Sequence, residues 1–349
     1  MLLKAASGGG GKGMRLVRSE GEIEQAFTAA QSEAQKAFGA GAIYLERYVA
    51  RPRHVEIQIL ADTHGRVSAL GERECSIQRR HQKLIEEAPS LAVTPALRRR
   101  LSDAATAAAG AVGYLNAGTI EFLLAPSGEF HFLEMNTRLQ VEHPVTELVY
   151  GVDIVREQLR VATGQPLRVH AGTLQPRGHA IECRITAEDP FNDFLPVTGV
   201  VQHLRVPGGP GIRWDGGVET GNEVTLHYDS LIAKLIVWGE TRAVALERMR
   251  RALRELVIVG IPTSQAFHLR VMDDPEFQRG DLDITYLDRA ATRLLSGGAR
   301  PDLTRPLAVV AALLADERRA TAAAQQPAPR PPDRPSAWVL AARREALRP

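Results

Sequence analysis

Acidic and amide side chains recur at strand spacing near the middle of this 349-residue sequence. Glu121 precedes a Pro-Ser-Gly turn, and Glu134 follows it at nearly the same distance, so a β-hairpin would place the two carboxylates opposite each other. Asn136 would share the face of Glu134, and Phe130 and Phe132 on that face indicate that it is partly covered. Facing carboxylates are unfavourable without a cation between them, and these oxygens suit phosphate-bridging Mg²⁺. The hairpin therefore predicts a metal site, with a solvated acidic face as the alternative.

The loop after this hairpin offers a second set of reactive groups. Arg138, Gln140 and Glu142 lie within five residues of one another. The planar guanidinium of Arg138 matches a small oxyanion such as bicarbonate, and Glu142 beside it can act as a general base. An exposed salt-bridge loop is the common alternative for such spacing. The position directly after the acidic hairpin favours an anion site.

A glycine-rich segment at residues 8–13 satisfies the G-x-G-x-x-G spacing. It leads into the strand-like residues 14–17, whereas nucleotide fingerprints of this kind lead into a helix. A P-loop is also excluded, because Lys12 is followed by Gly13 rather than by Ser or Thr. A hairpin tip rich in backbone N–H groups remains, suited to closing over phosphates, with Lys4 ahead of it as a point charge. The alternative is a disordered glycine turn.

Residues 78–83 form a basic run, Gln-Arg-Arg-His-Gln-Lys, followed by acids at 86 and 87. Such runs are usually solvated, and RNA contact is conceivable. The formal net charge of the chain is only +2, and aromatic residues are absent near the run. An anion pocket is therefore the favoured interpretation.

The bulk composition sets limits on class and location. With 44% hydrophobic and 24% charged residues the chain is globular and long enough for two domains, and 5% aromatic content argues against nucleic-acid binding. Two cysteines, Cys75 and Cys183, are too few for a disulfide framework and fit a reducing compartment. Neither a membrane span nor a signal peptide is predicted, so the expected location is the cytoplasm.

Strands and helices that would position these groups follow from periodicity and capping signals. Strands are expected at residues 2–5, 14–17, 44–48, 54–60, 119–124 and 129–136, with mostly short strands over 178–238. Helices are expected at residues 19–38, 95–111, 152–162 and 242–255, the second of them with Thr94 as its N-cap. Residues 137–144 are expected to form a loop. His54, Glu56 and Gln58 alternate with apolar residues, which indicates a strand with one polar face, often a solvent-exposed one.

Together these segments resemble the ATP-grasp module of biotin carboxylases, the subunits or domains of acetyl-, propionyl- and methylcrotonyl-CoA carboxylases. The resemblance covers roughly residues 1–295 and is carried by residues 4–14, 52–58, 78–89 and, most specifically, the run Glu-Met-Asn-Thr-Arg-Leu-Gln-Val-Glu-His-Pro at 134–144. Other ATP-grasp ligases share the two acids and the asparagine but not the whole loop. The resemblance implies an α+β ATP-grasp fold with a biotin carboxylase C-terminal domain.

The resemblance also implies roles for individual residues. Contacts to ATP would come from Lys4, Gly10, Gly11, Glu46, Arg47, Val49, His54, Gln78, His81, Glu121 and Glu134. Mg²⁺ or Mn²⁺ would be held by Glu121, Glu134 and Asn136, and bicarbonate by Lys83, Arg138, Gln140, Val141 and Glu142. Arg184 would hold biotin, and the catalytic residues would be Lys83, Arg138 and Glu142. Residues 46–49 would form the hinge beside adenine. Arg47 stands where the family commonly has lysine, but main-chain atoms of this hinge are still expected to contact adenine.

The implied activity is ATP- and bicarbonate-dependent carboxylation of biotin through carboxyphosphate, the first half-reaction of an acyl-CoA carboxylase. No Met-Lys biotin site occurs, so a biotin carboxyl carrier protein or domain would present biotin, and a carboxyltransferase subunit would use the product. A homodimer is expected when the enzyme is complete. Two alternatives stay open: another ATP-grasp ligase that joins a different acyl phosphate to an amine, and a truncated non-catalytic assembly scaffold.

The expected domain organisation follows the same resemblance. It comprises a partial lid subdomain with the glycine loop at 1–49, an ATP-grasp core at 50–177, a biotin carboxylase C-terminal domain at 178–300, a helix at 301–320, a Pro/Ala-rich linker at 321–335 and the stub of a further domain at 336–349. Family members carry an N-terminal domain before the position of Lys4, which this sequence is expected to lack. Poor stability or weak activity in isolation would follow.

Overall fold

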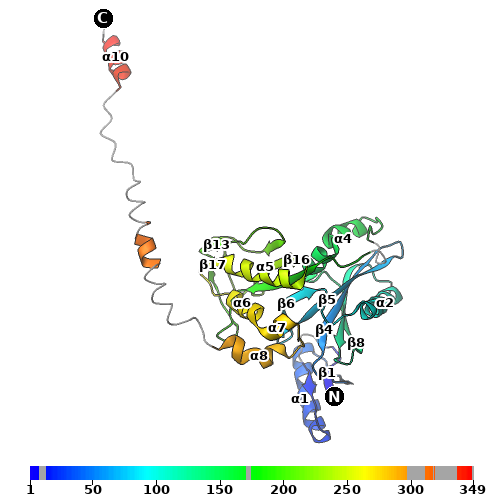
Figure 1. Ribbon diagram of the computed structural model, residues 1–349. Helices are drawn as coiled ribbons and strands as arrows, with labels where there is room; N and C mark the ends of the chain where they lie inside the picture. The colour runs from blue at the N-terminus through cyan, green and yellow to red at the C-terminus, as the bar shows by residue number, and fades with distance from the viewer. Residues whose placement is uncertain (8–12, 170–173, 297–310, 317, 319–335, 348–349) are drawn as a thin grey trace. The chain divides into compact units, whose positions relative to one another are not determined.

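The computed structural model describes residues 1–7, 13–169, 174–296, 311–316, 318 and 336–347 (Figure 1). The chain forms two units, Met1–Ser296 and Gly297–Pro349. In the second unit residues 311–316 are helical, as part of the predicted 301–320 helix, and α10 (Ala337–Glu345) begins after the N-cap Ser336. The predicted linker at 321–335 lies outside the described residues. Among the described residues, no helix combines the length and apolarity needed to cross a membrane.

The first 49 residues form a small antiparallel sheet covered by one helix. The sheet has the order β2-β1-β3, with β1 (Leu2–Ala5), β2 (Arg15–Leu16) and β3 (Ile43–Glu46). Helix α1 (Ile23–Phe38) follows a short 3₁₀ turn, and its buried residues Ala30 and Ala34 are small enough for close packing. These predicted elements are confirmed, to within a few residues at their ends.

An eight-stranded antiparallel sheet forms the centre of the first unit. Its strand order is β14-β16-β9-β6-β5-β4-β7-β8. The strands are β4 (Arg53–Ala61), β5 (Val67–Arg79), β6 (Gln82–Ala88), β7 (Asn116–Leu124), β8 (Phe130–Asn136), β9 (His179–Thr186), β14 (Ile212–Gly216) and β16 (Leu231–Gly239). Because β9 pairs with β6, the sheet is continuous across residues 177 and 178. The predicted domain boundary there stays a prediction.

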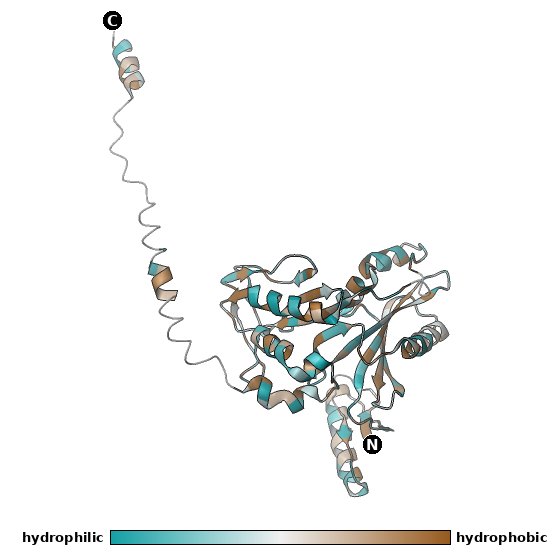
Figure 2. Ribbon diagram, in the orientation of Figure 1, coloured by the Kyte–Doolittle hydropathy of each residue, from teal (hydrophilic) through white to brown (hydrophobic). Residues whose placement is uncertain are grey.

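Helices cover both faces of this sheet, and alternate residues of each strand point to opposite layers (Figure 1). On one face lie α2 (Pro95–Ala111), α5 (Arg242–Glu255), α6 (Gln265–Asp273), α7 (Pro275–Arg279) and α8 (Tyr286–Leu295). On the other lie α3 (His143–Tyr150) and α4 (Ile154–Ala162). Polar residues interrupt the apolar ones along the central strands (Figure 2), and those that face α3 build the site described below.

Short strand pairs complete the first unit. They join β10 (Glu188–Asp189) to β11 (Leu195–Pro196), β12 (Gly199–Val200) to β15 (Glu223–Val224), and β13 (His203–Arg205) to β17 (Val257–Val259). The expectation of mostly short strands over 178–238 is confirmed, and the combination of helices and largely antiparallel sheet agrees with the predicted α+β class. The predicted N-cap is also present, since the Thr94 hydroxyl accepts a hydrogen bond from the backbone N–H of Leu97.

Three local expectations are wrong. The segment 137–144 is not a loop throughout, because α3 begins at His143, where Pro144 fits the first turn of a helix. The polar face of β4 is buried rather than solvent-exposed. Neither Phe130 nor Phe132 shares the face of Glu134, because an irregularity in the β7–β8 register reverses the alternation. Phe130 packs edge-on against Phe122, and Phe132 is exposed.

Candidate active site

A buried lysine lies at the centre of the polar face under α3. The Lys83 ammonium donates to Glu56 at 2.5 Å, to Glu121 at 2.9 Å and to Glu142 at 2.7 Å. The three carboxylates come from β4, β7 and the residue that precedes α3, and each is at most 3% exposed. Three buried acids around one cation require further positive charge or protons nearby. Two neighbouring arginines, Arg73 and Arg184, supply further positive charge.

Arg73 on β5 supplies one further charge and is itself fully buried. Its guanidinium donates to the side chains of Glu56, Gln58, Thr119, Gln140 and Thr146. These partners lie on β4, β7, α3 and the loop before α3. Because a guanidinium has five N–H donors in a fixed plane, this one residue locks the relative positions of four segments.

The predicted metal ligands meet at the β7–β8 hairpin. Glu121 pairs with Glu134 across the two strands. The Asn136 amide lies within hydrogen-bond distance of both, at 3.0 Å from Glu121 and 3.2 Å from Glu134. Glu121 is buried and Glu134 is exposed, so the set opens to solvent on one side. An oxygen-rich set of this kind fits Mg²⁺ or Mn²⁺.

The loop before α3 is held at three successive residues. The Gln140 amide donates to Glu121 at 2.8 Å, and the carbonyl oxygen of Val141 accepts from Lys234 at 2.8 Å. Glu142 accepts from Lys83. Arg138, by contrast, is exposed and donates to the adjacent carbonyl of Leu139. The loop therefore fixes its acid and leaves the Arg138 guanidinium at the surface of the cluster.

Arg184 on β9 completes the cluster from the far side of Glu142. Its Nε donates to Glu86 at 2.5 Å and its Nη2 donates to Glu142 at 3.0 Å. The Arg184 side chain is 16% exposed, so it is mostly but not wholly shielded from solvent. The residue predicted to hold biotin thus lies beside the predicted general base.

The electrostatics of the cluster fix its charge state. Burial would raise the pKa of Glu121, but His54 and Lys83 outweigh it and hold that pKa well below its usual range. Burial would lower the pKa of Lys83, but the carboxylates of Glu56 and Glu142 raise it well above its usual value. Glu142 is likewise an anion, because Lys83 and the two arginines offset burial and lower its pKa.

The other predicted nucleotide contacts are only partly brought together. His54 lies 3.0 Å from Glu121, and its second ring nitrogen lies 2.9 Å from the Gln78 amide. His81 is exposed in the tight β5–β6 turn. In the basic run around it, Arg79 and Arg80 both pair with Asp193, and Lys83 joins the cluster. Arg79, Arg80 and His81 also line a cavity of about 580 Å³, and the anion pocket there stays a prediction.

Within the first 49 residues, the Lys4 ammonium donates to Glu46 at 3.1 Å, and the Tyr44 hydroxyl donates to the same oxygen at 2.9 Å. Arg47 is exposed and Val49 is half-buried. Gly10 and Gly11 lie outside the described residues. The ATP contacts assigned to this segment stay predictions.

Two protein families match successive parts of the chain. Residues 1–170 match the family described as carbamoyl-phosphate synthase L chain, ATP binding domain, and residues 182–289 match the biotin carboxylase C-terminal domain. The biotin carboxylase of Nostoc sp. is 55% identical over 287 residues, which are 82% of this chain and 64% of the relative. The chain belongs to the biotin carboxylase family. It spans less than two thirds of the length of such relatives.

Other members of the biotin carboxylase family show how broad the match is. A pyruvate carboxylase subunit of Methanothermobacter thermautotrophicus is 53% identical over 288 residues, 82% of this chain and 58% of the relative. The biotin carboxylase domain dimer of Hydrogenobacter thermophilus 2-oxoglutarate carboxylase, solved with MgADP, ADP and bicarbonate, superimposes with a TM-score of 0.81 at 46% identity, covering 85% of this chain and 66% of that one. Biotin carboxylase from Campylobacter jejuni gives a TM-score of 0.79 at 47% identity, covering 82% and 64%. Family membership alone therefore does not select acyl-CoA over pyruvate or 2-oxoglutarate chemistry.

Several residues of this biotin carboxylase site were not predicted from the sequence. Glu56 was available as part of the alternating polar face of β4, but its role depends on burial that the pattern did not decide. Arg73 lies in an acid-flanked stretch with no strand signal strong enough to place it. Lys234 lies more than 90 residues after the loop whose Val141 carbonyl it binds, and the β6–β9 and β9–β16 pairings bring its strand beside that loop.

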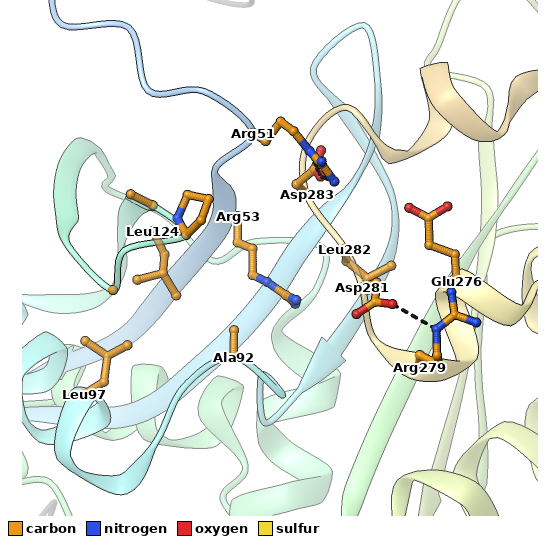
Figure 3. Close-up of a pocket in the computed structure, with 13 residues that line it drawn as sticks. Arg51, Arg53, Ala92, Leu97, Leu124, Glu276, Arg279, Asp281, Leu282 and Asp283 are labelled. Carbon is orange, nitrogen blue, oxygen red and sulfur yellow. Dashed lines mark hydrogen bonds and ion pairs between the residues drawn. The ribbon is translucent and has the colours of Figure 1, made fainter.

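A cavity of about 630 Å³ lies away from this cluster (Figure 3). It is bounded by the β7–β8 turn, the start of α2 and the segment after α7. Its charged groups already have partners: Arg51 pairs with Asp283, Arg279 with Asp281, and Arg53 donates to the carbonyl of Gly280. None of the predicted site residues lines it.

Proposed function

We propose that this chain carries the catalytic residues of a biotin carboxylase that uses ATP and bicarbonate to carboxylate biotin. The observation that carries the proposal is the Lys83 ammonium joined to Glu142, with Arg184 on the other side of that same carboxylate. A base held between two cations, beside an oxygen-rich hairpin and the exposed guanidinium of Arg138, suits proton removal from a bound oxyanion.

ATP and a divalent cation would occupy the open side of the β7–β8 hairpin. Mg²⁺ or Mn²⁺, held by Glu121, Glu134 and Asn136, would offset charge on the phosphates when bound. The residues proposed to contact ATP are Lys4, Gly10, Gly11, Glu46, Arg47, Val49, His54, Gln78, His81, Glu121 and Glu134. His54 and Gln78 are already hydrogen-bonded to each other, which fixes the imidazole orientation beside Glu121.

Bicarbonate would bind among Lys83, Arg138, Gln140, Val141 and Glu142. Glu142 takes its proton, and the freed oxygen attacks the γ-phosphorus as the bond to ADP breaks, which yields carboxyphosphate. Carboxyphosphate then separates into CO₂ and phosphate. Phosphate takes the ureido N–H proton of biotin, Arg138 stabilises the resulting anion, and the nitrogen attacks CO₂. Closure of the glycine segment over the phosphates would exclude water from the labile intermediate.

Biotin would be presented by a biotin carboxyl carrier protein or domain and would be placed by Arg184. A carboxyltransferase subunit would use the product, and the complete enzyme would be a cytoplasmic homodimer. The finer assignment to an acyl-CoA carboxylase is supported by the mitochondrial methylcrotonoyl-CoA carboxylase α subunit of Arabidopsis thaliana, 46% identical over 306 residues, 87% of this chain and 42% of that protein.

The test is ATP cleavage by the full-length protein that contains this chain. Cleavage that depends on both bicarbonate and free biotin is expected, and Arg138→Ala should abolish biotin carboxylation. Near-normal turnover of Arg138→Ala would contradict the role of that arginine. Cleavage independent of biotin would indicate a different ATP-grasp ligase, and calorimetry without nucleotide binding would indicate an assembly scaffold.

A further inference from the structure

Two buried glutamates face each other behind Arg184. Glu86 on β6 and Glu182 on β9 are direct cross-strand partners, and both are 0% exposed. Glu86 binds Arg184 through its Oε1. In the part of the chain that the structure describes, the Oε2 of Glu86 and both carboxyl oxygens of Glu182 have no hydrogen-bond partner. Three adjacent orphan oxygens in a dry interior require an explanation.

The cations closest to this pair are already engaged elsewhere. Arg184 divides its donors between Glu86 and Glu142, and Lys234 donates to the carbonyl of Val141 and pairs with Asp215 at 3.4 Å. Neither donates to Glu182. Two anions side by side without a cation between them are strongly unfavourable away from water, so one of the two carboxyls must carry a proton.

We propose that Glu182 is a positioning residue of the biotin site: it carries a proton, donates it to the free oxygen of Glu86, and so holds Arg184 toward Glu142 and biotin. This inference rests on the proposed function. One shared proton pairs the free oxygen of Glu86 with one oxygen of Glu182, so of the three orphan oxygens only the neutral carbonyl oxygen of Glu182 keeps no partner among the described residues. It also keeps the Glu86–Glu182 pair at a single negative charge. The positive charge of Arg184 is then not cancelled by a second buried carboxylate, and Arg184 can still stabilise an anion of biotin.

The electrostatics of the surroundings agree with this arrangement. Burial, and then the Glu86 charge, raise the pKa of Glu182 well above its usual value. Burial raises the pKa of Glu86 to about 7. The charged groups that act on the pair are Lys83 on β6, Arg184 on β9, Lys234 on β16 and Glu142 before α3.

Two substitutions of Glu182 in the full-length protein test whether its side chain acts as a hydrogen-bond donor or only fills space. Glu182→Leu removes the donor and leaves Glu86 unpaired, so the KM for free biotin should rise about tenfold, as for the loss of one charge-assisted hydrogen bond. The KM values for bicarbonate and ATP, measured with biotin present, should change less. Glu182→Gln supplies an amide donor at the same place and should rescue most of the loss. A Glu182→Gln variant as impaired as Glu182→Leu, or two variants with unchanged KM, would overturn the proposal.

The pH profile gives a second readout. Raising the pH ionises the second carboxyl of the wild-type pair, adds a negative charge beneath Arg184, and should lower kcat/KM for biotin on the alkaline side. Glu182→Gln cannot ionise, so its profile should lack this alkaline fall. An identical fall in the variant would count against the proposal.

A third readout does not need activity. The infrared spectrum of the wild type minus that of Glu182→Gln should contain the carbonyl band of a protonated carboxylic acid at neutral pH, and a spectrum with carboxylate bands alone would overturn the protonation of Glu182. Glu87→Gln is the matched control, since Glu87 is the next residue on β6 and points to the other face. It should lower stability without raising the KM for biotin. If the wild type cleaves no ATP, the proposed function fails while this spectrum still tests the proton.

Discussion

At the scale of single residues, the site is a balance of buried charges. Lys83 touches three carboxylates, Arg73 touches one of them, and Arg184 touches another. Such a network contributes little to stability as a whole, because desolvation of each ion opposes the attraction between them. Removal of one member is costly, because its partners stay buried and lose their counter-charge.

Lys83→Ala should therefore destabilise the chain by about 3 kcal/mol or more at neutral pH, the usual effect of breaking a buried ion pair. The loss should shrink as the pH falls, because the uncompensated glutamates can then take protons. Urea unfolding at pH 7 and pH 5 measures both effects. Arg80→Ala is the control: its pair with Asp193 is exposed on both sides, and its unfolding curve should match the wild type. Equal stabilities for the wild type and Lys83→Ala at pH 7 would contradict the balance described here.

The buried carboxylate of Glu87 should make the stability of the fold depend on pH in a lower range than Lys83 does. Although burial alone would raise its pKa, Arg242 and His179 lower it from the ordinary 4.5 to about 2. A depressed pKa stabilises the fold above the unfolded value and loses that contribution as the pH falls through the folded value. Glu87→Gln should thus cost about 3 kcal/mol between pH 5 and 7, because a tenfold change in proton affinity corresponds to about 1.4 kcal/mol. The gap should narrow toward pH 3 in urea unfolding, and a constant gap down to pH 3 would refute the assignment.

At the scale of elements, the sequence was informative where local signals were strong. The turn before Phe130 and the alternation around Glu121 predict the hairpin that brings Glu121, Glu134 and Asn136 together, and the structure has that hairpin. The start of α3 at His143 was missed, because the short helix follows a polar loop and its stability comes from packing on the sheet rather than from its own propensity. The register irregularity that turns Phe130 away is likewise a tertiary effect without a local signal.

The packing of α3 on the sheet can be tested at Gly71. This residue of β5 has φ of 79°, and a Cβ there would collide with the Tyr150 side chain of α3. Gly65 has a similar φ of 82°, but a Cβ there would meet open space. Gly65→Ala should cost about 1 kcal/mol for the left-handed backbone alone. Gly71→Ala should cost about 1–3 kcal/mol more, because α3 must shift.

Urea unfolding of the two alanine variants measures this difference directly. Because Glu142 immediately precedes α3, Gly71→Ala should also impair bicarbonate-dependent ATP cleavage in the full-length protein, whereas Gly65→Ala should not. Equal losses of stability in the two variants would show that α3 does not need the space above Gly71.

At the scale of the whole molecule, one sheet joins segments that the two matched families divide between them. Because β6 pairs with β9, residues from both matched regions lie in the same eight-stranded sheet and contribute to the charged cluster on it. Arg184 and Lys234 come from one region and Glu142 from the other. If the two matched regions came apart between residues 177 and 178, a sheet edge would be exposed and buried ions would lose their partners. Both changes are unfavourable. The central sheet should therefore unfold as one cooperative unit.

Native-state hydrogen exchange on the 349-residue chain tests this cooperativity. Backbone amides of β4 and β16 lie in different family regions, yet their opening free energies should converge on one value with the same dependence on denaturant. Exchange should be faster in the β2-β1-β3 sheet, because that small sheet has a single covering helix and few buried apolar side chains. If β9, β14 and β16 open together at a clearly lower free energy than β4, the two regions fold separately, and the pairing of β6 with β9 is an interface between domains rather than part of one core.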